Sequence, residues 1–259
     1  MKGGAEAAHA SSYTALAQRI KAEGLLERRH GWYVMRGLVL AAALALGVVL
    51  LVTLGRTWWQ LLVAAYFSVV FTQIAYLAHD SAHKQIFSSG PRGELVSRIV
   101  SNLFVGLSYG WWMNKHTRHH ANPNTVGKDG DIRPGAVVFV ADDMEQRTGF
   151  TGRLTTRQGY YFIPILLLAG LDLHVSAVKA ILGGEVAQHR VQEAVLIGVR
   201  LLGFATLVLL LLGPSLGLAF MAVQLAVFGL YMAARSRRTT SGCASSATSR
   251  RWTTSAARC

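Results

Sequence analysis

The sequence predicts an all-α membrane protein with two transmembrane helical hairpins, which make four spans, and a cytoplasmic cap of clustered histidines. Of the 259 residues, 52% are hydrophobic and only 15% are charged, which is too apolar a balance for an ordinary soluble domain. Two uncharged stretches, residues 37–54 and 61–78, are separated by only six residues. Because a helix needs about 20 apolar residues to cross the hydrocarbon layer, each stretch is long enough to span it.

The first hairpin is expected to begin in the cytoplasm. Its connector, residues 55–60 (GRTWWQ), carries two tryptophans, which are enriched at membrane–water interfaces. Residues 1–36 are polar, and their basic residues place the N-terminus in the cytoplasm by the positive-inside rule. Nearly all of the basic residues behind the net charge of +13 lie outside the apolar stretches, where they face lipid headgroups, so no nucleic acid is expected as a partner.

Two later apolar stretches, residues 195–212 and 216–232, form the second hairpin around a Gly-Pro-Ser turn. Between the hairpins, residues 95–113 are only moderately apolar and are expected to form an interfacial helix. Residues 160–173 are apolar but short, and they contain Pro164. If they crossed the bilayer, the polar residues after them would face away from the histidines. The four-span arrangement is therefore preferred, with residues 160–173 in the interface.

The chain thus divides into a cytoplasmic N-terminal segment (1–36), a membrane domain (37–232) and a basic tail (233–259). From Arg235 onward the tail has six arginines, six serines and five threonines, and it contains no acidic residue and no Leu, Ile or Val. Such a composition cannot bury a core, so the tail is expected to be disordered. Its two cysteines, Cys243 and Cys259, predict neither a disulfide framework nor a metal site.

Five of the nine histidines lie within 42 residues, in two clusters. His79 and His83 are four residues apart, and His116, His119 and His120 follow an i, i+3, i+4 spacing, so each cluster fits one helix face. Imidazole is a common ligand of iron, zinc and copper. A catalytic zinc usually takes three protein ligands, so five imidazoles favour two metal ions.

A metal-binding imidazole often donates the N–H of its other ring nitrogen to a carboxylate, which fixes the orientation of the ring. Three carboxylates close to the clusters could do this: Asp80, Asp129 and Asp131. His174 and His189 are isolated and are expected to be structural rather than further ligands. Near the second cluster, Tyr109, Trp111 and Trp112 are expected to be interfacial anchors.

Other interpretations of the clusters remain open. A lone His-x-x-x-His is more often incidental, and histidines at a membrane face could instead sense pH. A metal transporter also carries histidine-rich loops. However, the spans lack paired carboxylates or histidines near the bilayer midplane, which disfavours transport.

The motifs HDSAH (residues 79–83), KHTRHHANPN (115–124) and GKDGDI (127–132) resemble those of membrane fatty acid desaturases. The likeness is greatest to the bacterial acyl-lipid or acyl-CoA group related to front-end desaturases, and ILLLAGLDLHVSAV (165–178) fits that group as well. The resemblance covers about residues 10–232. It implies a bacterial inner-membrane oxidoreductase of lipid metabolism, which introduces a C=C bond into an acyl chain with O₂.

The resemblance also implies two iron ions held by three histidine boxes, with no catalytic residue beyond the metal ligands. The first two boxes correspond to His79 and His83, and to His116, His119 and His120. The substrate would be an acyl-lipid or acyl-CoA. No His-Pro-Gly-Gly haem motif is present, so electrons would come from a separate donor, ferredoxin-like or another reductase system. A related lipid hydroxylase would use the same iron chemistry.

The family's third histidine box is expected after the last span, but residues 233–259 contain no histidine. The resemblance therefore implies a truncated or frameshifted chain that is inactive because its iron site is incomplete. The alternative is a non-catalytic remnant, or a partner subunit of an intact desaturase.

Overall fold

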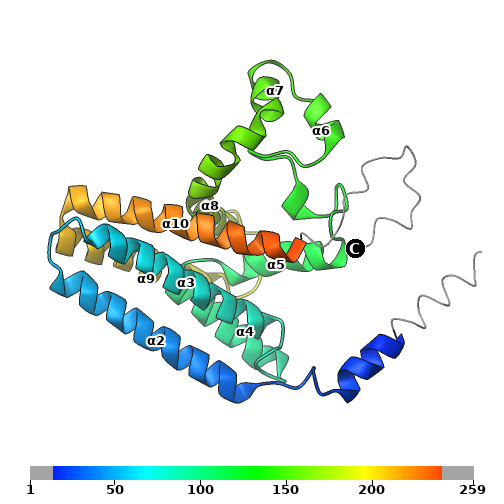
Figure 1. Cartoon of the computed structure of the whole chain (residues 1–259), viewed down its shortest axis with the longest axis horizontal. Helices are drawn as coiled ribbons and strands as arrows, with labels where there is room; N and C mark the ends of the chain where they lie inside the picture. Colours follow the sequence, from blue (N-terminus) through cyan, green and yellow to red (C-terminus); the bar gives the residue numbers. More distant parts are fainter. Residues whose placement is uncertain (1–13, 241–259) are drawn as a thin grey trace, which may run out of the picture.

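The computed structural model describes residues 14–240, with side chains from 14 to 234, and every regular element in that range is a helix. Five helices are long and apolar enough to cross a membrane (Figure 1): α2 (His30–Thr53), α3 (Gln60–Ala82), α8 (Gln158–Leu182), α9 (Arg190–Leu212) and α10 (Pro214–Thr240). Helices α2 with α3 and α9 with α10 are the two hairpins that the sequence predicts. The fifth candidate, α8, was expected to be a short interfacial segment.

Helix α8 is longer than expected because the polar residues near its middle do not end it. Asp172 and His174 follow the apolar stretch in the sequence, but His174 is buried and the helix continues to Leu182. It ends where Gly183 is followed by Gly184, which has a positive φ of 80°. The structure therefore contains five candidate spans by length and composition, and the preference for four, with residues 160–173 in the interface, stays a prediction.

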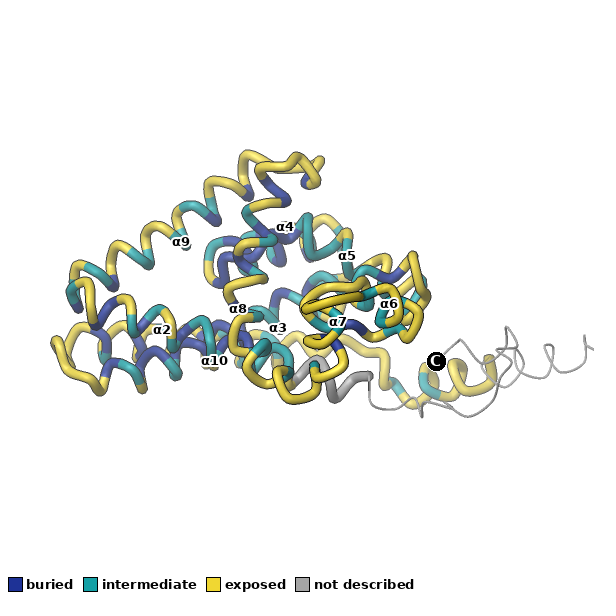
Figure 2. Tube along the Cα trace, turned by 90° about the horizontal axis from the view of Figure 1, so that it is seen from above, coloured by how far each residue is buried: buried dark blue, intermediate teal, exposed yellow. Residues whose placement is uncertain are grey.

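Helix α3 lies at the centre of the bundle. In its apolar window 50% of the residues are buried, against 11% in α2 and 17% in α9. Figure 2 shows the resulting pattern, with much of α2 and α9 exposed. Exposed apolar side chains on these two helices, such as Leu38 and Leu202, suit a surface that faces lipid.

Aromatic rings from three helices form the middle of the core. Phe67 stacks on Phe71 at 5.4 Å and meets Phe204 and Phe220 edge-on at 5.9 and 6.2 Å between ring centroids. The guanidinium of Arg200 lies over Phe71 and Phe204, 4.3 and 4.2 Å from their centroids. Such aromatic and cation–π pairs add to the apolar burial that holds α3, α9 and α10 together.

The turns of the two hairpins lie side by side at one end of the bundle. Buried Gln60 donates from Nε2 to the carbonyls of Leu51 and Gly55, both at 2.9 Å, which closes the first turn. Arg56 donates from Nε to the carbonyl of Leu211 at 3.1 Å, which links the first turn to the second hairpin. Both turns therefore lie on the same side of the bundle.

Helices α8 and α10 cross with their backbones in contact. A Cβ on Gly170 would overlap the carbonyl oxygen of Leu225, and one on Gly229 would overlap the backbone of Gly170. Only a residue without a side chain allows this approach, and small residues are the usual means of packing membrane helices closely.

The interfacial helix expected over residues 95–113 is broken in the structure. The segment forms α4 (Gly90–Ile99), a π-helix η1 (Val100–Val105) and α5 (Tyr109–Ala121). The break lies at Gly106, which has a φ of 88°, and at Ser108, whose side chain caps α5 by accepting from the N–H of Trp111. The loop after α5 holds η2 (Gly130–Ile132), α6 (Ala141–Glu145) and α7 (Gly149–Thr156).

The last helix extends into the tail that was expected to be disordered from residue 233. Helix α10 continues to Thr240. The rest of the expected tail, including both cysteines, lies outside the described residues, as does the first part of the charged N-terminal segment, before residue 14.

Candidate metal centre

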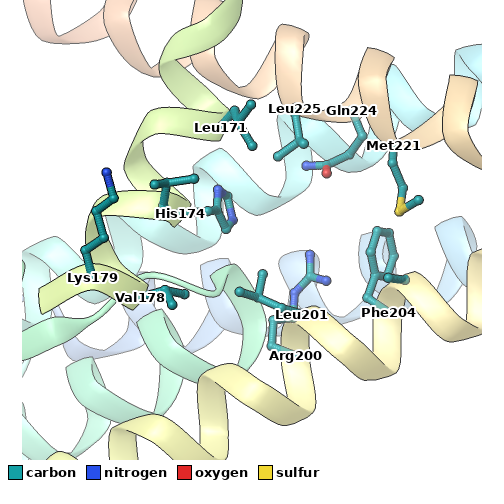
Figure 3. A pocket seen from close by; sticks show the side chains of 12 residues that line it. Leu171, His174, Val178, Lys179, Arg200, Leu201, Phe204, Met221, Gln224 and Leu225 are labelled. Atoms are coloured by element: carbon teal, nitrogen blue, oxygen red, sulfur yellow. The ribbon is translucent and has the colours of Figure 1, made fainter. Parts of the chain in front are cut away.

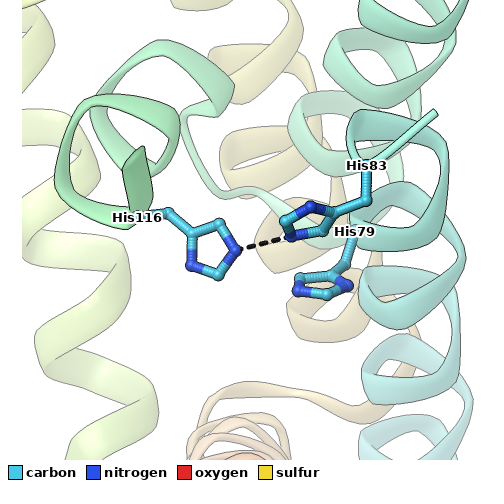
Figure 4. A group of neighbouring side chains, drawn as sticks. All are labelled: His79, His83 and His116. Atoms are coloured by element: carbon cyan, nitrogen blue, oxygen red, sulfur yellow. Dashed lines mark hydrogen bonds between the residues drawn. The ribbon is translucent and has the colours of Figure 1, made fainter. Parts of the chain in front are cut away.

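The two histidine clusters meet at the end of the bundle opposite the hairpin turns. His79 lies in the last turn of α3 and His83 directly follows that helix, while His116 and His120 lie on α5. The His83 ring centroid is 4.5 Å from that of His79 and 5.0 Å from those of both His116 and His120. Figure 4 shows His79, His83 and His116 turned toward one another.

The nitrogen atoms of these rings are close enough to share an ion. Nε2 of His116 lies 2.8 Å from Nε2 of His83 and 3.0 Å from Nε2 of His120. One nitrogen each from His79, His83 and His116 can be chosen so that all lie within 4.8 Å of one another. With metal–nitrogen bonds of about 2.0–2.1 Å, two nitrogens on one ion lie about 3–3.5 Å apart, so the group fits a transition metal after small shifts.

Two of these imidazoles are held neutral, as metal ligands must be. Burial, followed by the neighbouring histidines, lowers the pKa of His116 to about 3. Burial and then His79 lower the pKa of His83 as well. Both rings therefore keep a lone pair near neutral pH.

His119 turns away from the other four histidines, although the sequence groups it with them. Its Nδ1 lies 2.8 Å from Oδ2 of Asp129 and 3.4 Å from Oδ2 of Asp131. A carboxylate accepts hydrogen bonds, so Nδ1 carries a proton and Nε2 is the nitrogen that can face an ion. The structure thus brings together His79, His83, His116 and His120, and it places His119 in a second group with Asp129 and Asp131.

Asp129 is held ionised inside the loop that follows α5. It is fully buried, and it accepts hydrogen bonds from the backbone N–H groups of Asn124 and Asp131 at 2.8 and 2.9 Å. Burial alone would raise the pKa of Asp129, but the bonds from Asp131, Asn124 and His119 lower it below its usual value. The expected carboxylate–imidazole contact is therefore present for Asp129, and Asp131 adds a longer one.

The third carboxylate, Asp80, lies between the first cluster and α2. Its Oδ1 is 3.5 Å from Nδ1 of His79, and its Oδ2 is 3.5 Å from the hydroxyl of Tyr33 and 3.9 Å from Arg36. These contacts place the start of α2 beside the end of α3. They also place Asp80 where it can orient the His79 ring.

One side chain of this site was not predicted from the sequence. Trp112, expected to be an interfacial anchor, stacks on His116 with 4.3 Å between centroids and 24° between planes, and it lies 5.5 Å from His79. Tyr109, from the same expected group, is buried. A local signal for the contact exists, because Trp112 and His116 are four residues apart and so share one face of α5.

The two isolated histidines do not join the centre. Both ring nitrogens of His174 face backbone carbonyls, at 2.6 Å from Gly170 and 3.2 Å from Val105. His189 is exposed just before α9 begins.

A cavity of about 370 Å³ lies between α8, α9 and α10 (Figure 3). Its lining is mainly apolar, with Leu171, Leu201 and Met221 among the lining residues. The polar side chains of His174 and Arg200 also border it. A mainly apolar cavity with a few polar groups is the usual form of a binding site for an apolar ligand.

Comparison with known proteins identifies the family. The model of the family described as "Fatty acid desaturase" matches residues 56–253. The chain belongs to the fatty acid desaturase family. Desaturases of this family act on fatty acyl groups in a lipid environment, and the five long apolar helices agree that the chain is an integral membrane protein.

Curated relatives from animals and plants support the assignment. The chain is 33% identical over 121 residues to the Delta(5) fatty acid desaturase fat-4 of Caenorhabditis elegans, covering 47% of this chain and 26% of the relative. It is 32% identical over 156 residues to the Acyl-lipid (9-3)-desaturase of Physcomitrium patens, covering 57% of this chain and 29% of the relative. No solved structure matches the chain. The chain therefore spans between a quarter and a third of the length of these relatives.

Proposed function

We propose that this chain forms the first two histidine boxes of a diiron fatty acid desaturase, whose reaction is the O₂-dependent introduction of a C=C bond into an acyl chain. The observation that carries the proposal is the approach of His83, directly after α3, and His116, on α5, to 2.8 Å between their Nε2 atoms. Bound iron would supply O₂ activation and the removal of hydrogen from an unactivated CH₂ group, with electrons from a separate carrier.

The protein's own residues would hold and orient the metal ions. His79, His83, His116 and His120 would bind one iron. His119, with its Nδ1 proton held by Asp129, would offer Nε2 to a second. Asp80 and Asp131 would act with Asp129 as the orienting carboxylates. The apolar cavity between α8, α9 and α10 would accept part of an acyl-lipid or acyl-CoA chain.

Of the histidines that meet at the two clusters, only His119 would be left for the second iron. No histidine follows His189 in the sequence, whereas the family resemblance implies a third box. We infer that the metal site in this chain is incomplete and that this chain alone does not desaturate lipids.

Iron content and lipid products test this function together. We expect the purified chain to bind iron at fewer than two ions per chain, and we expect no new unsaturated or hydroxylated fatty acids when it is produced with a reductase system. Elemental analysis and gas chromatography measure the two results. A folded chain without any bound iron would refute the metal site, and new products would refute the inferred inactivity. Hydroxylated products would identify a hydroxylase.

We further propose that the histidine boxes and the N-terminus are cytoplasmic, and that α8 does not cross the bilayer. Three contacts support this. Arg28 donates to the carbonyl of Lys84 at 3.1 Å, so the basic start of α2 lies beside the first box. Glu193, at the start of α9, contacts Gly110 of α5 at 2.9 Å. Gln158, at the start of α8, bonds Val138 in the loop after α5. The segments at both ends of α8 therefore lie on the side of the bundle that carries the histidines.

Cysteine labelling tests this topology. With Cys243 and Cys259 replaced by serine, we expect Gly159→Cys, exposed in the first turn of α8, and Gln188→Cys, exposed in the loop after α8, to react with an impermeant maleimide only after the membrane is opened. Thr57→Cys, in the first hairpin turn, should react in intact cells. Labelling of positions 159 and 188 from opposite sides would show that α8 crosses.

A further inference from the structure

A buried carboxylate from α9 holds the start of the helix that carries the second histidine box. Glu193 is 1% exposed and lies 85 positions after Ser108 in the chain. Its Oε2 accepts a hydrogen bond from the Ser108 hydroxyl at 2.6 Å, and its Oε1 accepts from the N–H of Gly110 at 2.9 Å. The Ser108 hydroxyl in turn accepts from the N–H of Trp111 at 3.2 Å.

This arrangement satisfies two of the free N–H groups that begin α5. Gly110 is bound directly, and Trp111 is bound through Ser108. A negative charge at a helix N-terminus also interacts favourably with the helix dipole, and hydrogen bonds to an ionised group are about twice as strong as neutral ones. Glu193 therefore fixes where α5 begins and in which direction it leaves.

The chain just before α5 is held by two more side chains from α8 and α9. Arg200 of α9 donates from Nε to the carbonyl of Phe104 at 2.8 Å, and His174 of α8 lies 3.2 Å from the carbonyl of Val105. Gly106 then packs so closely that a Cβ would lie 2.9 Å from the side chain of Leu201. Side chains of α8 and α9 thus hold the link between η1 and α5 in place.

The positions of the histidines on α5 depend on how the start of this helix is held. His116 lies six residues beyond Gly110, about 9 Å along the helix axis, so a tilt of about 10° would move it by roughly 1.6 Å. Metal–ligand distances tolerate deviations of only about 0.2 Å. A small change at Glu193 would therefore separate His116 and His120 from His79 and His83.

We propose that Glu193 is a positioning residue for the metal centre: by anchoring the start of α5 it sets the second histidine box opposite the first. The inference rests on the proposed iron-binding function of those histidines. It assigns no contact between Glu193 and the metal, the substrate or O₂.

Cobalt binding tests the proposal, because Co²⁺ reports ligand geometry through its visible absorption. We expect Glu193→Ala to weaken Co²⁺ binding by about 10- to 100-fold, as loss of an outer partner of a metal site does, and to alter the absorption spectrum. Glu193→Gln keeps an acceptor for the N–H of Gly110 and should restore much of both. Glu185→Ala, at an exposed carboxylate in the loop before α9, is the matched control and should behave as the unmodified chain.

Hydrogen exchange on the metal-free protein separates this inference from the proposed function. We expect Glu193→Ala to lose amide protection over residues 109–121, with α3 and α10 unaffected, and Glu193→Gln to regain it. Absence of Co²⁺ binding by the unmodified chain would refute the proposed function alone. Unchanged exchange in α5, or an unchanged cobalt spectrum and affinity in Glu193→Ala, would overturn the positioning role. Loss of protection throughout the bundle would also overturn it, by showing that Glu193 supports the whole fold.

Discussion

Replacement of His116 by alanine is expected to remove the metal site while leaving the helical bundle intact. His116 has its Nε2 within 3.0 Å of the Nε2 atoms of His83 and His120, and its ring is 5.1 Å from that of His79, so it joins the two boxes. We expect iron or Co²⁺ binding to weaken by more than about 100-fold, the upper range for loss of an outer partner, because a direct ligand is lost.

Equilibrium metal titration of the purified protein measures this effect. His189→Ala removes an exposed imidazole just before α9 and should leave the affinity unchanged. A similar loss in both variants would point to nonspecific surface binding, and an unchanged affinity in His116→Ala would rule out the shared centre. Circular dichroism should show equal helix content in all three proteins.

The second large effect is expected at the crossing of α8 and α10. Gly170→Ala would place a methyl group on the carbonyl oxygen of Leu225 and close to the backbone of Gly229, and neither backbone can yield as a flexible side chain would. The two helices must then separate, at a cost of about 1–3 kcal/mol or more in the free energy of unfolding, as in other overpacked cores.

The matched control for this prediction is a glycine-to-alanine substitution that should raise the stability of the protein instead of lowering it. Gly203 lies exposed in the middle of α9, and a Cβ added there would meet no other atom within 4 Å. Gly203→Ala should stabilise the protein by about 0.5–1 kcal/mol, because glycine is unfavourable inside a helix. Thermal unfolding in detergent compares the two variants. Equal stability of Gly170→Ala and the unmodified chain would show that the helices do not cross backbone to backbone.

The two hairpins could be predicted because their signal is local. An uncharged run of sufficient length predicts a helix whatever lies beside it, and each hairpin has a turn that the composition marks. Helix α8 could not be predicted in the same way. The polar His174 in its sequence suggests a helix end, whereas in the structure the carbonyls of Gly170 and of the distant Val105 accommodate its ring.

The candidate site shows the same division between local and distant information. Helical spacing predicts that the histidines of each box lie on one face of a helix. It also indicates that His119 and His120 point in different directions. Successive residues on a helix are about 100° apart, and here His119 points toward Asp129 and Asp131 while His120 points toward His116. The spacing of Trp112 and His116 is equally local. The role of Glu193 is not local, since 83 positions separate it from Gly110 and no periodicity relates them.

The central place of α3 has a consequence for how the two boxes come together. His79 and His83 end the most buried of the long helices, so their backbone is already ordered by the packing of the bundle before any ligand arrives. Helix α5 is much less buried, since Tyr109 is the only one of its residues that is buried. The first pair of imidazoles is therefore the more rigid half of the site, and the larger share of the entropic cost of completing it falls on the part of α5 beyond the start that Glu193 holds.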